Sequence, residues 1–74
     1  MLQVDLQDPN EKIRQFVNDQ CSKHGEVVSI EIHRAPNPFA LVEMAHHLQT
    51  LELAGQFGGS AFGTAALIHL EQKP

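Results

Sequence analysis

Two prolines separated by one residue, Pro36 and Pro38, constrain the fold of this chain more than any other feature. Proline has no amide hydrogen to donate and biases the residue before it toward extended backbone, so residues 35–38 can form neither a helix nor a central strand. Before them, residues 27–33 are rich in β-branched side chains and alternate between apolar and polar, and residues 39–44 form a second apolar run. We therefore expect two strands joined by a short, stiff connection.

The alternation also predicts which side chains of these strands enter the core. We expect the core side to carry Val28, Ile30 and Ile32 in the first strand, and Ala40, Val42 and Met44 in the second. The opposite side of the first strand then carries Ser29, Glu31 and His33. Because Glu43 is charged, its side of the second strand should face away from the core, and Phe39 and Leu41 share that side.

Two helices are predicted, over about residues 9–24 and 46–56. Asp8 can cap the first turn of the first helix, Pro9 fits its first position, and Gly25 ends it. Apolar side chains recur at helical spacing in both segments, as Ile13, Phe16, Val17 and Cys21 in the first and as Leu48, Leu51, Leu53 and Ala54 in the second. Each helix should pack one face on the sheet.

Two further strands are expected at about residues 2–6, where the side chains alternate, and at 65–70, which are apolar on both sides. A glycine-rich connector, residues 58–63, leads into the last strand, and Phe57 and Phe62 should pin it to the core. Residues 1–74 thus form one α+β domain with the order β-α-β-β-α-β. A domain this small buries only roughly 60% of its unfolded surface.

Several classes of protein are disfavoured by composition. No apolar run reaches the length of a membrane helix and the N-terminus lacks the pattern of a signal peptide, so we expect a soluble, intracellular protein without a membrane partner. Cys21 is the only cysteine, which excludes an internal disulfide and a cysteine-based zinc site. The formal net charge is −4 and the five basic residues are scattered, so the sequence carries no basic patch for a polyanion.

No catalytic or cofactor site is predicted. Cys21 lies on the apolar face of the first helix, where thiols are usually inert, although His24 is within helical reach. The segment 58–63 lacks the Lys-Ser/Thr pair of a phosphate-binding loop and precedes a strand instead of a helix. The adjacent His46 and His47 project to different sides, which disfavours a metal site. We therefore expect a non-catalytic protein without cofactor or metal.

Residues 37–44, Asn-Pro-Phe-Ala-Leu-Val-Glu-Met, resemble the strand-three octapeptide of the RNA-recognition-motif (RRM) family, with matches at Phe39, Ala40 and Val42. The element order and the run from Gly25 to Ile32 are similar to that family as well. The resemblance implies a ferredoxin-like sandwich, in which a four-stranded antiparallel sheet carries both helices on one face and leaves the other open to bases. It also implies a strand order that puts His33 and His69 on opposite edge strands.

The resemblance implies weak binding of single-stranded RNA. Phe39 keeps one stacking position, but Leu41 and Gln3 stand at the two other aromatic positions, and two lost stacks cost roughly 2–6 kcal/mol. Polar residues on the same face offer other contacts. Gln3, Asp5 and His33 can hydrogen-bond to base edges and Arg34 can meet a phosphate, whereas Glu31 and Glu43 repel the backbone.

A second hypothesis uses the same face for a protein partner. Phe39, Leu41 and Leu67 form an apolar patch on that face, with Gln3, Glu31 and Glu43 at its rim. An acidic rim favours a protein over a nucleic acid. A second copy of the chain is one such partner, so the sequence leaves both RNA and protein binding open.

Overall fold

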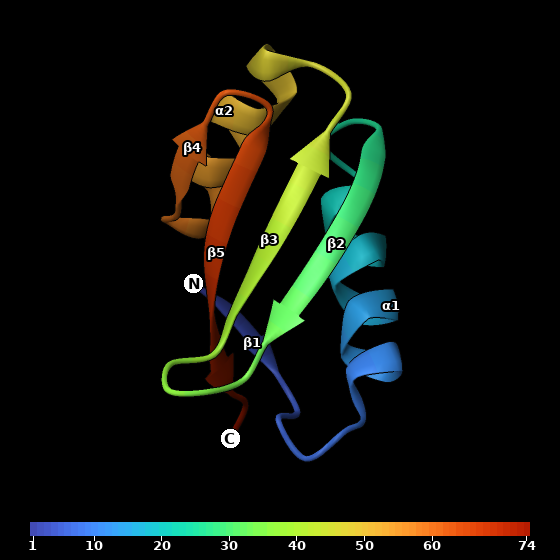
Figure 1. The fold of residues 1–74 in the computed structure, drawn as a ribbon, viewed down its shortest axis with the longest axis vertical. Helices are drawn as coiled ribbons and strands as arrows, with labels where there is room; N and C mark the ends of the chain where they lie inside the picture. Colours follow the sequence, from blue (N-terminus) through green and yellow to red (C-terminus); the bar gives the residue numbers. More distant parts are fainter.

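The computed structural model describes residues 1–74 as two helices and five strands (Figure 1). In chain order these are β1 (Leu2–Val4), α1 (Asn10–Cys21), β2 (Val27–His33), β3 (Phe39–Met44), α2 (His47–Phe57), β4 (Ser60–Phe62) and β5 (Ala65–Gln72). The α+β class and each predicted helix and strand are confirmed. β4 was not predicted, because its three residues lie within the connector at 58–63.

The sheet is mixed and five-stranded, which differs from the expected arrangement of four antiparallel strands. Its order is β1-β5-β3-β2, and β4 pairs with β5 beside this path. The pairs β2–β3, β3–β5 and β4–β5 are antiparallel, but β1 runs parallel to the end of β5, with Leu2 opposite Leu70. Since β1 lies at the edge, β5 pairs directly with β3.

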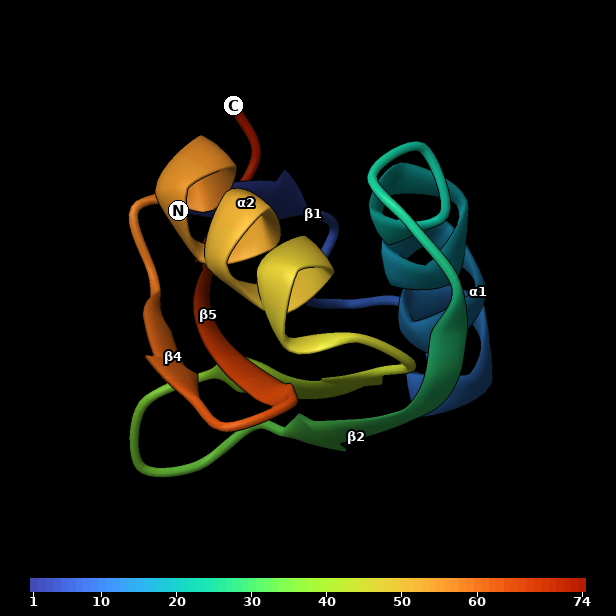
Figure 2. The same ribbon diagram turned by 90° about the horizontal axis from the view of Figure 1, so that it is seen from above.

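Both helices lie on one side of the layer formed by β2, β3 and β5, as expected (Figure 2). α1 contacts β2, and α2 contacts β5 and β3. β5 curves toward the helix side as it approaches β1, so the sheet wraps partly around the core (Figure 2). Neither helix is long and apolar enough to cross a membrane.

The core forms between the sheet and the helices. Its buried side chains are Leu2, Val4, Ile13, Val17, Cys21, Ala40, Val42, Met44, Leu53, Ala66, Ile68 and Leu70. The predicted inward set of β3, Ala40, Val42 and Met44, is confirmed. Thr50 is the one buried polar residue, and its hydroxyl donates to the carbonyl oxygen of Thr64 at 2.9 Å. This bond satisfies a hydroxyl that would otherwise destabilise the core.

The predicted orientation of β2 is correct for Ile30 and Ile32 and wrong for Val28. The β2–β3 register shifts between Val27 and Ser29, and this irregularity leaves Val28 60% exposed while Val27 packs against the core. A β-bulge inserts an extra residue and re-aims the side chain at that point. Alternation alone cannot place Val28.

The predicted apolar face of α2 is correct for Leu53 and Ala54 but wrong for Leu48 and Leu51, which are exposed. Thr50, Leu53 and Ala54 form the buried face. At about 100° per residue, Leu48 lies on the opposite side of the helix from Thr50. Two more aromatic residues differ from expectation, since Phe16 is partly exposed on α1 and Phe62 is 62% exposed on β4.

The helix termini also differ from the prediction. Pro9 is the N-cap of α1 and no side chain caps this end. Asp8 instead forms an ion pair with Lys12 at 3.8 Å. α1 ends at Cys21, before the predicted end at residue 24, and the turn that follows includes Gly25 with φ +154°. This φ favours glycine, and a Cβ here would also displace the side chain of Gln49, whose Cδ lies 2.4 Å from the Cβ position.

Candidate functional site

The sheet has an outer face, which we define as the side of β2, β3, β4 and β5 that points away from the helices. Strand pairing arranges its side chains in three rows that run across the strands. The rows are His33–Phe39–His69, Glu31–Leu41–Leu67–Ser60 and Ser29–Glu43–Ala65–Phe62. Five predicted site residues, His33, Phe39, Leu41, Glu43 and Leu67, therefore lie together on this face.

The first row is aromatic. The rings of His33 and Phe39 are stacked, with centroids 4.6 Å apart and an angle of 13° between their planes. His69 is the partner of Phe39 on the other side, in β5. His33 and His69 thus both flank Phe39, whereas we expected them on opposite edge strands. The difference arises because β1 does not separate β3 from β5.

The second row is apolar at its centre. Leu41 and Leu67 are direct cross-strand partners, and both are half-buried although no helix covers them. In the third row, Phe62 adds an exposed aromatic ring beside Ala65. Sequence reasoning missed Phe62 and His69 as residues of this face. Period-two alternation from Leu67 to His69 was a usable signal for His69, but the three-residue β4 offered none for Phe62.

The outer face is acidic. Glu31 and Glu43 lie on it, and it carries no lysine or arginine. Glu31 Oε2 is 3.9 Å from Nε2 of His33, and the Glu31 side chain is 67% exposed. A polyanion approaching this face meets repulsion from the carboxylates, whereas a cationic group meets attraction.

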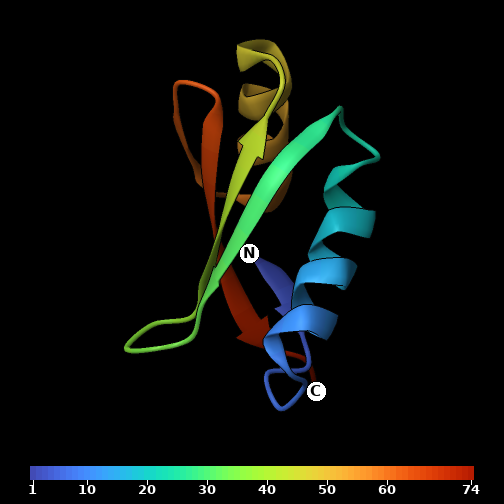
Figure 3. The same ribbon diagram turned by 45° about the vertical axis from the view of Figure 1, so that its right-hand side comes forward.

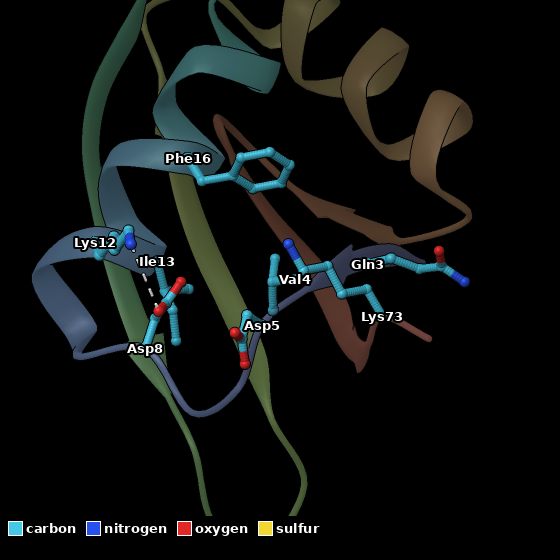
Figure 4. A pocket seen from close by; sticks show the side chains of 8 residues that line it. All are labelled: Gln3, Val4, Asp5, Asp8, Lys12, Ile13, Phe16 and Lys73. Carbon is cyan, nitrogen blue, oxygen red and sulfur yellow. Dashed lines mark ion pairs between the residues drawn. The ribbon is translucent and has the colours of Figure 1, made fainter.

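Gln3 and Asp5 lie elsewhere, at a cavity of about 260 Å³ between β1 and α1 that Phe16 and Lys73 also line (Figure 4). Gln3 Nε2 donates to Oε1 of Glu71 at 3.4 Å. The Asp5 carboxylate accepts the backbone amide of Gln7 at 3.0 Å, and this hydrogen bond is the main reason that the pKa of Asp5 is lowered. The same bond turns the chain after Val4, which explains why β1 ends earlier than predicted.

Arg34 is bound to the β1–α1 connection. Its guanidinium donates to the carbonyl oxygen of Leu6 at 2.5 Å, to the carbonyl oxygen of Asp8 and to Oδ1 of Asn10. These three bonds connect the end of β2 to the start of α1. The predicted role of Arg34 as a phosphate ligand would compete with all of them.

No three side chains among the histidines, Cys21 and the carboxylates are placed to hold a metal ion. Cys21 is fully buried, and burial raises the pKa of its thiol to about 11. A thiol in this setting is protonated at neutral pH and a poor nucleophile. Comparison of the chain with protein-family models, curated proteins and solved structures finds no match.

Proposed function

We propose that this chain is a non-catalytic, RRM-like module that binds single-stranded RNA weakly through its outer face. The observation that carries the proposal is the row His33–Phe39–His69, which presents three aromatic rings on one exposed surface. The two helices on the opposite face and the β2–β3 hairpin are similar to the RRM arrangement. The position of β1 is not, so the proposal rests on the row and not on the complete topology.

The row supplies stacking surfaces that the sequence resemblance to the RRM family did not include. Imidazole rings stack on unpaired bases as phenyl rings do. His33 and His69, on either side of Phe39, therefore compensate for the non-aromatic Leu41 and Gln3. One base–aromatic stack is worth about 1–3 kcal/mol, so two stacks contribute roughly 2–6 kcal/mol, which corresponds to a Kd between tens of millimolar and tens of micromolar.

Charge limits the affinity. Glu31 and Glu43 lie beside the row, and no arginine or lysine on this face neutralises a phosphate. The complex should therefore release few counterions, and its affinity should depend only weakly on salt concentration. A strong salt dependence would place the RNA elsewhere on the molecule.

The experiment is a titration of the ¹⁵N-labelled protein with a single-stranded RNA octamer of mixed sequence. We expect amide shifts for residues 31–33, 39–41 and 67–69. Phe39→Ala should remove them, whereas Leu48→Ala, at an exposed apolar position on α2, should preserve them. Unchanged spectra at millimolar RNA would refute the proposal.

A protein partner is the second candidate, and the acidic rim around Leu41 and Leu67 favours it. An apolar centre with a charged rim is the usual anatomy of a protein interface. The double variant Glu31→Gln/Glu43→Gln separates the two candidates. It should strengthen RNA binding roughly threefold to tenfold by removing repulsion, and it should weaken a basic protein partner. Asp19→Asn/Glu52→Gln, at exposed positions on the two helices, removes the same number of charges and is the matched control.

Self-association through the outer face is one form of the second candidate. Amide shifts of β3 and β5 that depend on protein concentration, without RNA, would identify it. Phe39→Ala should abolish that dependence as well, because Phe39 lies at the centre of the face.

A further inference from the structure

A second candidate surface lies along the edge of β2 that points away from β3. β2 ends the strand order, so one of its two edges has no strand partner. Figure 3 shows α1 running alongside this edge, and the two elements are in contact. The backbone amide and carbonyl groups of an edge strand are available to another extended chain.

A continuous groove follows this edge. A cavity of about 440 Å³ lies between Glu11, Arg14, Gln15 and Asn18 of α1 and residues 27–30 of β2. A second cavity of about 190 Å³ shares Glu11, Arg14 and Ile30 with the first and continues to Ile32. The four α1 residues follow the spacing i, i+3, i+4 and i+7, so they form one helix face and one wall of the groove.

We propose that the α1–β2 groove binds an extended segment of a partner protein, which adds to β2 as a further strand and carries a lysine or arginine beside Glu31. A strand in this place would pair with residues 29–33, beyond the irregularity at Val27 and Ser29. A helix beside an open edge strand forms the two walls that such a segment needs.

The side chains of β2 set the chemistry of the bound segment. Successive side chains of an added strand point to opposite faces of the sheet. On the groove side they would meet Ile30 and Ile32, which favours aliphatic residues. On the outer side they would lie beside Glu31, whose side chain is 67% exposed, which favours a cation.

Charge also selects a partner over a second copy of the chain. Each copy has a formal net charge of −4, and its β2 presents Glu31 on the outer side with no lysine or arginine in the strand. Two copies paired along β2 would supply no cation to Glu31. The wall of the groove adds no opposing requirement, because Glu11 and Arg14 are paired with each other.

The probe is a capped hexapeptide in which lysine and valine alternate, titrated into the ¹⁵N-labelled full chain. We expect amide shifts in β2 and in residues 11–18, and slower hydrogen exchange in residues 29–33. Two further peptides of the same sequence test the backbone hydrogen bonds. Each carries N-methyl groups on alternate residues, so that the amides along one of its two edges can no longer donate. One of the two methylated peptides should lose at least tenfold in affinity. Equal binding of both would overturn the proposal.

Two protein variants test the side-chain contacts. Glu31→Lys should weaken the lysine–valine peptide roughly fivefold and create binding of a glutamate–valine peptide, since one cross-strand charge pair is reversed. Val28→Lys should weaken binding, because it replaces an apolar lining residue of the groove with a cation, and the matched control Leu48→Lys, 77% exposed on α2, should not. An unchanged peptide preference in Glu31→Lys would contradict the proposal.

The experiments distinguish a failure of the groove proposal from a failure of the proposed RNA binding. Phe39→Ala should leave binding of the lysine–valine peptide within twofold of the original, although it removes the RNA-induced shifts. Peptide shifts confined to β3 and β5 would place the peptide on the outer face and overturn the groove assignment. So would shifts of β2 that depend on protein concentration without peptide, because a second copy would then occupy the edge.

Discussion

At the scale of single residues, one side of β3 contributes to the core and the other side to the proposed binding surface. Ala40, Val42 and Met44 are buried against the helices, while Phe39 and Leu41 lie on the outer face. The division follows from strand alternation, and it separates stability from binding within six residues. Substitutions on the two sides should therefore have different effects.

Val42→Ala and Leu41→Ala form a matched pair of neighbours on opposite sides of β3. Val42 is fully buried, so its truncation should lower the free energy of unfolding by about 1–3 kcal/mol. Leu41 is half-buried, and its truncation should cost less and should weaken the outer-face interaction instead. Urea denaturation of both variants measures the difference. A larger loss for Leu41→Ala would mean that the outer face is part of the core.

Thr50, the one buried polar residue, lies within hydrogen-bond distance of two carbonyl oxygens, those of His46 at 3.2 Å and Thr64 at 2.9 Å. Its hydroxyl donates to the carbonyl oxygen of Thr64, which also accepts the backbone amide of Met44 at 2.8 Å. Thr50→Val keeps the shape and removes the donor, yet it leaves that carbonyl satisfied. We expect a loss of only about 0.5–1.5 kcal/mol in the free energy of unfolding, measured by urea denaturation. A loss above that range would show that the hydroxyl also orients the turn before β5.

At the scale of elements, the connection between β1 and α1 depends on Arg34, which lies far from it in the sequence. The guanidinium of Arg34 donates hydrogen bonds to acceptors on Leu6, Asp8 and Asn10. Lysine has no planar fork and cannot reach all three in the same geometry.

Arg34→Lys should therefore behave much like Arg34→Ala. In both variants we expect faster hydrogen exchange in residues 5–10. The bonds are exposed, so the loss in the free energy of unfolding should stay near about 1 kcal/mol. Arg14→Lys, an exposed arginine on α1, is the control. Normal protection of residues 5–10 in Arg34→Lys would show that charge alone holds the connection.

The same elements show which features of the fold can be predicted from local sequence patterns. The inward side of β3 was predicted correctly because burial alternates without interruption over its six residues. Val28 was misplaced because the irregularity at Val27 and Ser29 is a property of the β2–β3 pair. The bonds of Arg34 span at least 24 residues, so no local pattern contains them. Of the predicted site, the cluster around Phe39 came from alternation, whereas Gln3, Asp5 and Arg34 depended on where β1 lies.

At the scale of the whole molecule, β1 joins the two ends of the chain. Leu2 and Val4 pair with Leu70 and Gln72, and the side chains of Leu2 and Val4 are both buried. A parallel strand of three residues at a sheet edge has few hydrogen bonds of its own, so it depends on the core beneath it. The core and the termini should therefore unfold together.

Cys21 reports on this cooperative unfolding. The thiol is fully buried on α1, in the core cluster that also includes Leu2 and Val42. Burial raises its pKa from 9.0 to about 11, so the native state keeps its proton where the unfolded chain loses it. The free energy of unfolding should therefore fall as pH rises from 9 toward 11, and remain free of this effect below pH 9.

Alkylation of Cys21 with iodoacetamide should then proceed through the unfolded state. At pH 8 the native protein should react slowly, and Val42→Ala should accelerate the reaction by the factor that its lost stability predicts, about tenfold for each 1.4 kcal/mol. Arg34→Ala should accelerate it less, because that variant loosens the β1–α1 connection more than the core. Equal acceleration by both variants, or a native rate near that of a free thiol, would mean that α1 opens on its own while the sheet stays folded. The helix wall of the α1–β2 groove would then be the least stable part of the molecule, instead of part of one cooperative unit.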